Sequence, residues 1–199
     1  MSQFLSILSD IVGWTYFITW SMSFYPIAWT NFRTKKAVGL SIDYAFVNIY
    51  SNILNGVYNY TGFIFPDIGT NHVPVQDLVY STHAIMLCTV YYVQAKIYPN
   101  GNQKMSIITF FIIGVTFLLV IILFILELNH IGTSKYWNTA MLCGYLKDVI
   151  TVCKYTPQVY RNWKRKCTKG WNIWSVIFDF SGGVFSYLQI AIDGKFSCC

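Results

Sequence analysis

The sequence predicts an all-α membrane protein of six spanning helices, arranged as two tandem three-helix repeats of which the second holds only two helices. Hydrophobic residues make up 55% of the 199 residues and charged residues only 11%, whereas about 25% of a soluble domain is charged. A motif that combines a proline with cations occurs twice. Six segments are long enough to cross a bilayer, which takes roughly 20 mostly apolar residues: about 11–31, 43–65, 77–98, 106–127, 136–158 and 171–193.

The repeated motif is a proline near the end of an apolar segment, followed by cations, a glycine and a second apolar segment. Aligning Pro26 with Pro157, 131 positions later, also aligns Gly39 with Gly170. One offset that aligns several residue types indicates an internal duplication. Each proline removes a backbone donor and predicts a break or kink, which makes Pro26 and Pro157 candidate hinges. The two turns lie at about 25–43 and 156–173.

The segment between the repeats has to carry the chain back across the membrane, because two repeats of one orientation need an odd number of helices between them. Residues 106–127 contain hardly any polar side chains, which favours a connector helix that faces lipid. We therefore divide the chain into a first repeat, 1–98, a connector region, 99–135, and a second repeat, 136–199. Only two helices are expected in the second repeat, so the seventh helix of the full pattern is missing.

Lysine and arginine are distributed unequally between the two sides of the predicted bundle. Ten lie on one side, against Lys135 and Lys195 on the other. Cytosolic loops are rich in these residues, so both repeat turns are expected in the cytosol and the N-terminus outside it. Met1 to Asp10 is expected to form a short exposed tail. The ten cations are Arg33, Lys35, Lys36, Lys96, Lys104, Arg161, Lys164, Arg165, Lys166 and Lys169.

The net charge of +6 does not indicate nucleic-acid binding, because the cations adjoin apolar segments and form no separate basic domain. The expected surroundings are a lipid bilayer. The six cysteines lack the spacing of a zinc site. No motif for a catalytic nucleophile or for phosphate binding occurs, so we expect neither an enzyme nor a metal or organic cofactor.

Asp179 is a carboxylate inside the sixth apolar segment. A charge within a bilayer costs a few kcal/mol on insertion scales, so such a residue usually serves a function. Protonation removes the charge, which makes Asp179 a candidate proton-coupling site. The alternative is an ion pair with Lys147 or Lys154 that only holds the helices together. Asn48 occupies the equivalent position in the first repeat and is a candidate to hydrogen-bond the substrate or a gate.

Lys147 and Lys154 are seven residues apart and therefore lie on nearly one face of the fifth helix. Lys154 is near the helix end, where a lysine ordinarily extends to the membrane surface. Lys147 is too deep to do so, and a substrate carboxylate is a natural partner for it. Four asparagines of the second segment, at spacings of four, three and four, are expected to face protein or water: Asn48, Asn52, Asn55 and Asn59.

Several motifs resemble those of the PQ-loop family, and within it the lysosomal exporters that couple cystine to protons. The resemblance runs from Gly13 to about Leu188. In two departures, Ile27 replaces the glutamine that follows the first proline, and the seventh helix is missing. The motifs are Gly13-Trp14-x-Tyr16-Phe17, Trp20-Ser21-x-Ser23-Phe24-Tyr25-Pro26, Gly39-Leu40-Ser41-x-Asp43, Ser81-x-His83-Ala84, Lys154-Tyr155-x-Pro157-Gln158 and Asp179-Phe180-x-Gly182-Gly183-x-Phe185-Ser186.

The resemblance implies a SWEET-like bundle and gives roles to particular residues. Asp179 matches the family's coupling aspartate, and Asp77, together with Ser81-x-His83-Ala84, matches its proton-handling segment. As a residue at a helix start, Asp77 is alternatively an N-cap. Three aromatic residues spaced four apart in the first segment face the repeat axis and match the family's pocket lining. The residues implied to bind substrate are Tyr16, Trp20, Phe24, Asn48, Lys147, Lys154 and Tyr155.

The implied function is export of L-cystine from the lumen of a lysosome or vacuole to the cytosol by alternating access. Protons would be the coupling ion, and no cofactor is expected. The chain would be a multi-pass protein of that membrane with a lumenal N-terminus, and its partners would be L-cystine, the lipid bilayer and proteins at the lysosomal membrane. Two alternatives stay open: transport of another amino acid or a sugar, and a non-transporting membrane receptor or regulatory protein.

Overall fold

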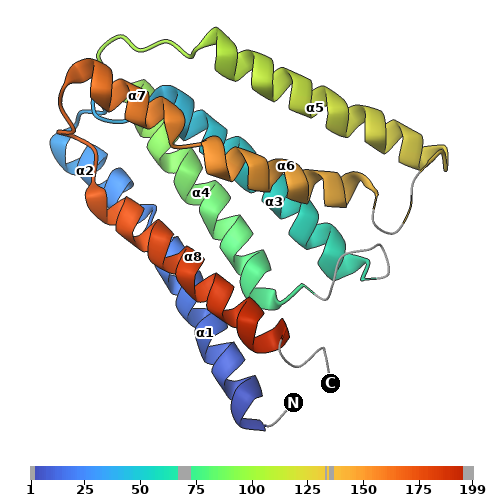
Figure 1. Cartoon of the computed structure of the whole chain (residues 1–199). Coiled ribbons are helices and arrows are strands. Elements are labelled where there is room, and N and C mark those ends of the chain that lie inside the picture. The colour runs from blue at the N-terminus through green and yellow to red at the C-terminus, as the bar shows by residue number, and fades with distance from the viewer. Residues whose placement is uncertain (1–2, 67–72, 133, 135–136, 195–199) are drawn as a thin grey trace.

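The computed structural model of the chain is a bundle of helices (Figure 1). It describes residues 3–66, 73–132, 134 and 137–194. Lys135, Lys195 and the predicted start of the fifth segment at 136 lie outside the described residues. The described part contains eight helices: α1 (Gln3–Met22), α2 (Tyr25–Thr34), α3 (Ile42–Ile64), α4 (Val75–Ile97), α5 (Ile107–Leu128), α6 (Thr139–Cys153), α7 (Thr156–Arg165) and α8 (Ile173–Gly194).

The first and fifth predicted segments are each broken into two helices. α1 gives way to α2 immediately before Pro26, and α6 gives way to α7 immediately before Pro157. Proline lies in the first turn of each second helix, where its missing N–H would have no helical partner in any case. The predicted breaks are therefore confirmed at both prolines.

The helix boundaries repeat with the offset of 131 that the sequence indicates. α2 begins at Tyr25 and α7 at Thr156, while α3 begins at Ile42 and α8 at Ile173. α2 and α7 also end alike, because the residue after each, Lys35 and Lys166, adopts a left-handed conformation with φ of 49° and 51°. The duplication is thus present in the backbone as well as in the sequence.

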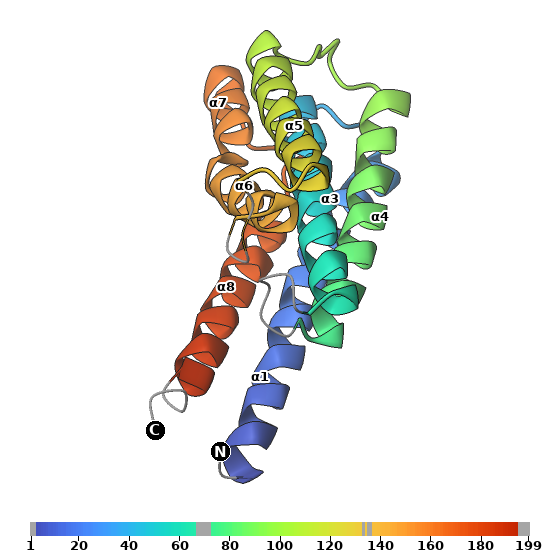
Figure 2. The same cartoon turned by 90° about the vertical axis from the view of Figure 1, so that its right-hand side faces the viewer.

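Packing between the repeats follows the same symmetry. α1 packs along α8, and α3 packs along α6, which are equivalent pairs once α1 is matched with α6 and α3 with α8. Figures 1 and 2 both show α1 and α8 side by side. α4 packs against α3 and against the α1–α2 pair. Among the described residues no helix of the second repeat corresponds to α4.

α5 lies at the edge of the bundle (Figure 1), and its main packing partners among the described helices are α6 and α3. Figure 2 shows α5 in front of these two helices. Thr109 and Leu123 are its buried residues, and Thr116 forms a 3.0 Å hydrogen bond with the hydroxyl of Tyr50 on α3. By length and composition, α5 and residues 173–192 of α8 are the two described helices that are able to cross a membrane. The remaining predicted spans are interrupted at proline or carry a polar face.

The polar face of α3 is turned into the protein, as predicted. The side-chain amide of Asn48 donates to the hydroxyl of Tyr91 at 2.6 Å. Asn55 and Asn59 both donate to Ser81 Oγ, at 3.1 and 2.7 Å. Because each of these asparagines is buried, the hydrogen bonds hold α3 to α4 where water is excluded.

Two predictions about segment ends are wrong. The expected tail is helical from Gln3, so the first helix starts well before residue 11. These early turns have a partner, since Gln189 on α8 donates to the carbonyl oxygen of Ser9 at 3.2 Å. The cations expected in the turn after the fifth span include Arg161 and Lys164, which lie on α7. The chain stays helical there because the break before Pro157 lets a new helix begin.

Candidate functional site

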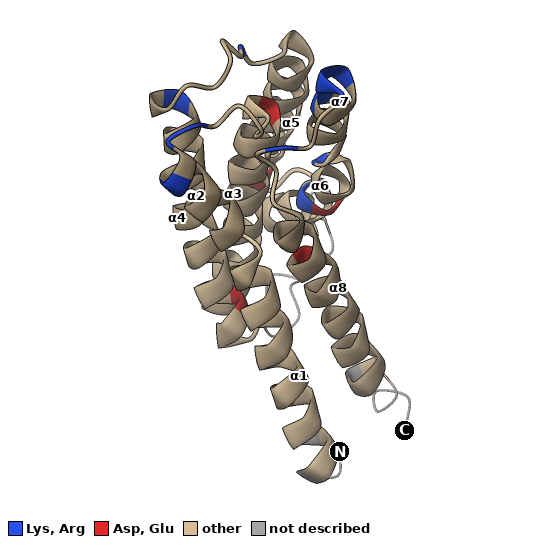
Figure 3. Ribbon diagram, turned by 90° about the vertical axis from the view of Figure 1, so that its left-hand side faces the viewer, with Lys and Arg blue, Asp and Glu red and all other residues tan. Residues whose placement is uncertain are grey.

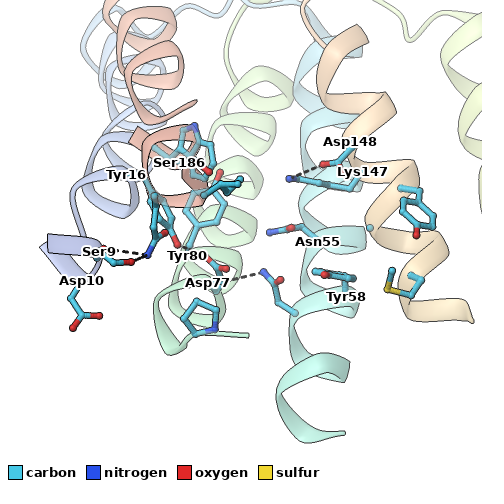
Figure 4. Close-up of a pocket in the computed structure, with 18 residues that line it drawn as sticks. Ser9, Asp10, Tyr16, Asn55, Tyr58, Asp77, Tyr80, Lys147, Asp148 and Ser186 are labelled. Atoms are coloured by element: carbon cyan, nitrogen blue, oxygen red, sulfur yellow. Dashed lines mark hydrogen bonds and ion pairs between the residues drawn. The ribbon is translucent and has the colours of Figure 1, made fainter. Parts of the chain in front are cut away.

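A cavity of about 920 Å³ lies among α1, α3, α4, α6 and α8. We call it the main cavity. It occupies the end of the bundle opposite α2, α7 and their loops, where lysine and arginine gather (Figure 3). Side chains of several helices point into it (Figure 4). Its walls include Ser9, Asp10, Tyr16, Trp20, Asn55, Tyr58, Asn59, Asp77, Tyr80, Lys147, Asp148, Ser186 and Gln189.

Asp77 lies in the wall of the main cavity, in the first turn of α4. The hydroxyl of Tyr16 on α1 donates to Asp77 Oδ1 at 2.9 Å. The N-cap of α4 is Pro74, so the N-cap alternative for Asp77 is wrong. The turn places the Asp77 carboxylate beside Tyr16, where it is available to a ligand or a proton.

Lys147 and Asp148 bring both signs of charge to the opposite wall, on α6. Lys147 Nζ lies 3.2 Å from Asp148 Oδ1, and the two side chains are 31% and 72% exposed. Lys147 lines the cavity and also pairs with its neighbour. Since Asp77 lies across the cavity, a ligand would meet a cation on one side and carboxylates on both.

Aromatic rings form the inner end of the main cavity. Trp20 contacts the rings of Tyr16 and Tyr80 at centroid distances of 5.3 and 5.6 Å. Its indole N–H donates to the backbone carbonyl of Asp179 at 3.1 Å. Trp20 lies directly against Gly182, where an added Cβ would be only 2.3 Å from Trp20 Cδ1. The ring thus separates the cavity from the charged group behind it.

Asp179 lies behind this aromatic layer and is held by two residues at the break between α6 and α7. Lys154 Nζ is 3.0 Å from Asp179 Oδ2, and the Tyr155 hydroxyl donates to the same oxygen at 2.5 Å. Lys154 is buried, so it does not extend to the surface as a lysine near a helix end usually does. Of the two lysines considered as partners of Asp179, the structure selects Lys154.

Beyond the ion pair, towards the cationic end, the path is blocked by aromatic rings and by backbone. Tyr44 contacts the rings of Tyr155 and Trp171 at 5.5 and 5.1 Å. The equivalent glycines Gly39 and Gly170 then touch, since a Cβ on Gly39 would lie 2.2 Å from the carbonyl carbon of Gly170. Only glycine permits this approach. We call the contact of Gly39 with Gly170 the closure.

Gln158 strengthens the closure by hydrogen bonds from the second repeat to the first. Its side-chain oxygen accepts from the backbone N–H of Ser41 at 2.8 Å, and its nitrogen donates to the carbonyl of Gly39 at 2.9 Å. The equivalent residue in the first repeat, Ile27, packs in the apolar core. The amide bridge is therefore made by one repeat alone, which is the structural consequence of the departure at Ile27.

The structure brings only part of the predicted site together. Tyr16, Trp20, Asp77 and Lys147 line the main cavity. Lys154 and Tyr155 instead hold Asp179, behind Trp20. Their places follow from the break before Pro157, which turns the end of α6 inward. Neither these two residues nor Asp179 lines the main cavity.

Two further predicted substrate residues lie away from the main cavity. Asn48 is committed to Tyr91 on α4, and Phe24 packs on the rings of Tyr80 and His83 at 6.3 and 6.5 Å. Both side chains are buried. α1 ends at Met22, so the regular spacing of four does not extend to Phe24. Its ring nevertheless packs on Tyr80, which also contacts Trp20.

Three tyrosines that the sequence did not single out lie on α3 and α4. Tyr58 and Tyr80 line the cavity, and Tyr44 lies in the blocked path. No spacing pattern separates these tyrosines from the many that only pack. Asn55 and Asn59 belong to the predicted inward face, and that periodicity already placed them near the site.

Comparison with known proteins identifies the repeats. A family model described as "PQ loop repeat" matches residues 8–67 and 139–197. The chain is 35% identical over 202 residues to cystinosin of Bos taurus, with 96% of this chain and 54% of the relative covered. It is 37% identical to a cystinosin homolog of Dictyostelium discoideum (95% and 69% covered). It is 30% identical to a cystine transporter of Saccharomyces cerevisiae (92% and 78%). The chain thus spans about half the length of the Bos taurus relative.

Proposed function

We propose that this chain, which belongs to the PQ-loop repeat family, exports L-cystine together with protons from the lumen of a lysosome or vacuole to the cytosol. Transport, not catalysis, is the proposed activity. The main support is one arrangement: a charged cavity at the end opposite the cations, closed towards the cationic end. Cations mark the cytosolic side, so the cavity would open to the lumen, where the N-terminus would also lie.

The chemistry of the cavity fits L-cystine. This substrate carries two ammonium and two carboxylate groups at neutral pH, with a disulfide between them. Lys147 is a partner for a carboxylate, and Asp77 and Asp148 are partners for ammonium groups. The volume of about 920 Å³ lies within the roughly 300–1,000 Å³ of small-molecule sites. A sugar would leave these charges unmatched, which favours an amino acid as the cargo.

Proton coupling is proposed to use Asp77 and Asp179 in turn. Asp77 is reached from the lumen through the cavity, whereas Asp179 is paired with Lys154 behind Trp20. A proton on Asp179 would end the ion pair and free Tyr155, which packs on Tyr44 in the blocked path. Ending a buried ion pair removes an attraction that favours the closed arrangement.

Alternating access would then come from rocking of the repeats. The breaks before Pro26 and Pro157 lie at equivalent depths in the two repeats, which is where hinges are needed. Separation of Gly39 from Gly170 would open the cytosolic side, and loss of the proton to the neutral cytosol would reset Asp179. No chemical bond of the substrate changes in this cycle.

The test is uptake of labelled L-cystine by proteoliposomes that contain the purified chain. With an acidic compartment on the side of the main cavity, we expect flux out of that compartment that a protonophore reduces. Asp179→Asn should abolish this gradient-driven flux. Cystine flux of the same size with and without the pH gradient would contradict proton coupling. Saturable cystine binding without flux would favour the receptor alternative.

A further inference from the structure

A second cavity, of about 710 Å³, lies at the cationic end and shares no lining residue with the main cavity. It is bounded by α7, the start of α3, the loop before α5 and the first turn of α5. The transport path proposed above does not use it.

The charge of the second cavity is strongly positive. Lys104, Arg161, Lys164 and Arg165 line it, against one carboxylate. That carboxylate, Asp43, already accepts from the backbone N–H of Ser106 at 2.8 Å. An anion in the cavity would therefore meet four cations with little competition from Asp43.

Some of these cations have unused hydrogen-bonding capacity. Arg165 Nη1 is buried and has no hydrogen-bond partner among the described residues. Lys104 and Lys164 are exposed and, within the described part of the chain, make no hydrogen bond or ion pair. Arg161 differs, because its guanidinium is bound to the carbonyl of Val38 at 2.7 Å. A buried guanidinium nitrogen without an acceptor is costly, and a turn of the Arg165 side chain towards a ligand oxygen in the cavity would relieve that cost.

The rim of the second cavity is apolar on the side of α5. Ile108 and Tyr160 line the cavity while remaining 65% and 58% exposed. Further along α5 the exposed apolar surface continues through Phe111 and Ile112. A small soluble anion would make no favourable contact with this apolar surface. A lipid, in contrast, places its headgroup beside cations and its acyl chains along an apolar helix.

We propose that the second cavity binds the headgroup of a phosphoinositide from the cytosolic leaflet. Several phosphates on one ring match several cations in one cavity, and basic pockets between membrane helices on this side are suited to such headgroups. Thr156 and Pro157 form part of the wall, so the bound headgroup contacts the break between α6 and α7. The lipid is thereby placed to favour one arrangement of that break.

The test measures lipid binding to the purified chain in detergent by native mass spectrometry. Phosphatidylinositol 4-phosphate is the probe and phosphatidylcholine the reference lipid. The test variant is Lys104→Gln/Lys164→Gln. The matched control is Arg33→Gln/Lys36→Gln, which removes two exposed charges at the same end of the bundle from residues that do not line the cavity. Lys104→Arg/Lys164→Arg keeps the charge, and size-exclusion profiles verify that each variant is folded.

We expect one phosphoinositide per chain, with affinity at least about tenfold above that for phosphatidylcholine. The cavity variant should bind the phosphoinositide about tenfold more weakly, or weaker still, than the unchanged chain. The control and the arginine variant should stay within about twofold of the unchanged chain's affinity. Equal losses in the cavity variant and the control would overturn the proposal, because they indicate diffuse attraction to the cationic end. Equal binding of soluble inositol 1,4-bisphosphate and of the lipid would overturn it as well, because the acyl chains would then contribute nothing.

Discussion

Lys154 and Asp179 form a largely buried ion pair between the break of the fifth span and the second turn of α8, with 3.0 Å between Nζ and Oδ2. By the offset of 131, the equivalent residues of the first repeat are Ser23 and Asn48, which carry no charge. The two repeats thus share a backbone pattern but differ in charge at this level. Under the proposed function, this asymmetry limits coupling by a buried ion pair to the second repeat.

Breaking the ion pair from one side should destabilise the protein more than replacing both partners. Lys154→Met leaves Asp179 buried without its cation, and we expect a loss of about 3–5 kcal/mol. The double variant Lys154→Met/Asp179→Leu should recover most of this loss, because two apolar groups need no partner. Thermal unfolding in detergent measures both. A double variant no more stable than Lys154→Met would contradict the pairing.

Gly182 and its neighbour Gly183 provide a matched test of the aromatic layer. Gly182→Ala would place Cβ 2.3 Å from Trp20 Cδ1, so we expect Trp20 to be displaced, at a cost of about 1–3 kcal/mol. At Gly183 no described atom lies within 4 Å of the added Cβ, and alanine should stabilise the helix by up to about 1 kcal/mol. Thermal unfolding and cystine binding distinguish the variants. Similar effects at both positions would show that Trp20 does not seal this layer.

The closure predicts that substitution of Gly39 makes the interior more accessible from the cytosolic side. Gly39→Ala cannot keep its contact with Gly170. The overpacking, about 1–3 kcal/mol, should raise the fraction of molecules whose closure is open about fivefold or more. A cysteine at buried Ser175 reports on this, labelled from the cytosolic side in a background without Cys153 and Cys167. Gly114→Ala is the control, since nothing lies near its Cβ. Unchanged labelling of Gly39→Ala would exclude the closure as a barrier.

Lys147 should matter for cystine affinity through its charge. Lys147→Met removes the cation from the main cavity, and we expect cystine to bind about tenfold more weakly, which corresponds to about 1.4 kcal/mol. Lys147→Arg should retain most of the affinity. Lys96→Met, outside the main cavity, is the control. Scintillation proximity binding measures all three. An unchanged dissociation constant for cystine in Lys147→Met would show that Lys147 does not contribute to cystine binding.

Much of the architecture follows from local features of the chain. Proline forces the breaks before Pro26 and Pro157 wherever the helices pack, because the lost donor and the ring are properties of the residue itself. The spacing of the four asparagines determines which face of α3 is polar, and a polar face has to avoid lipid. The offset between repeats is likewise visible without coordinates, as the matched starts of α3 and α8 confirm.

Partner choice within the site depended on how distant helices pack. Lys147 and Lys154 share a face of the fifth span and differ mainly in depth, by about 10 Å over seven residues. Which of them meets Asp179 is decided by the level at which α8 lies beside α6, and that level is set by packing with α1 and α3. No local sequence pattern indicates the level at which α8 lies beside α6.

The sequence by itself determined the duplication, the breaks, the inward polar face of α3 and the end of the bundle that carries the cations, because each of these is written in residue type and spacing. Tertiary structure alone decided that Lys154 holds Asp179, that Phe24 packs on Tyr80 and His83, and that Gly39 meets Gly170. These contacts join residues that are far apart in the chain, and they depend on helix angles and depths that emerge only when all the helices pack together.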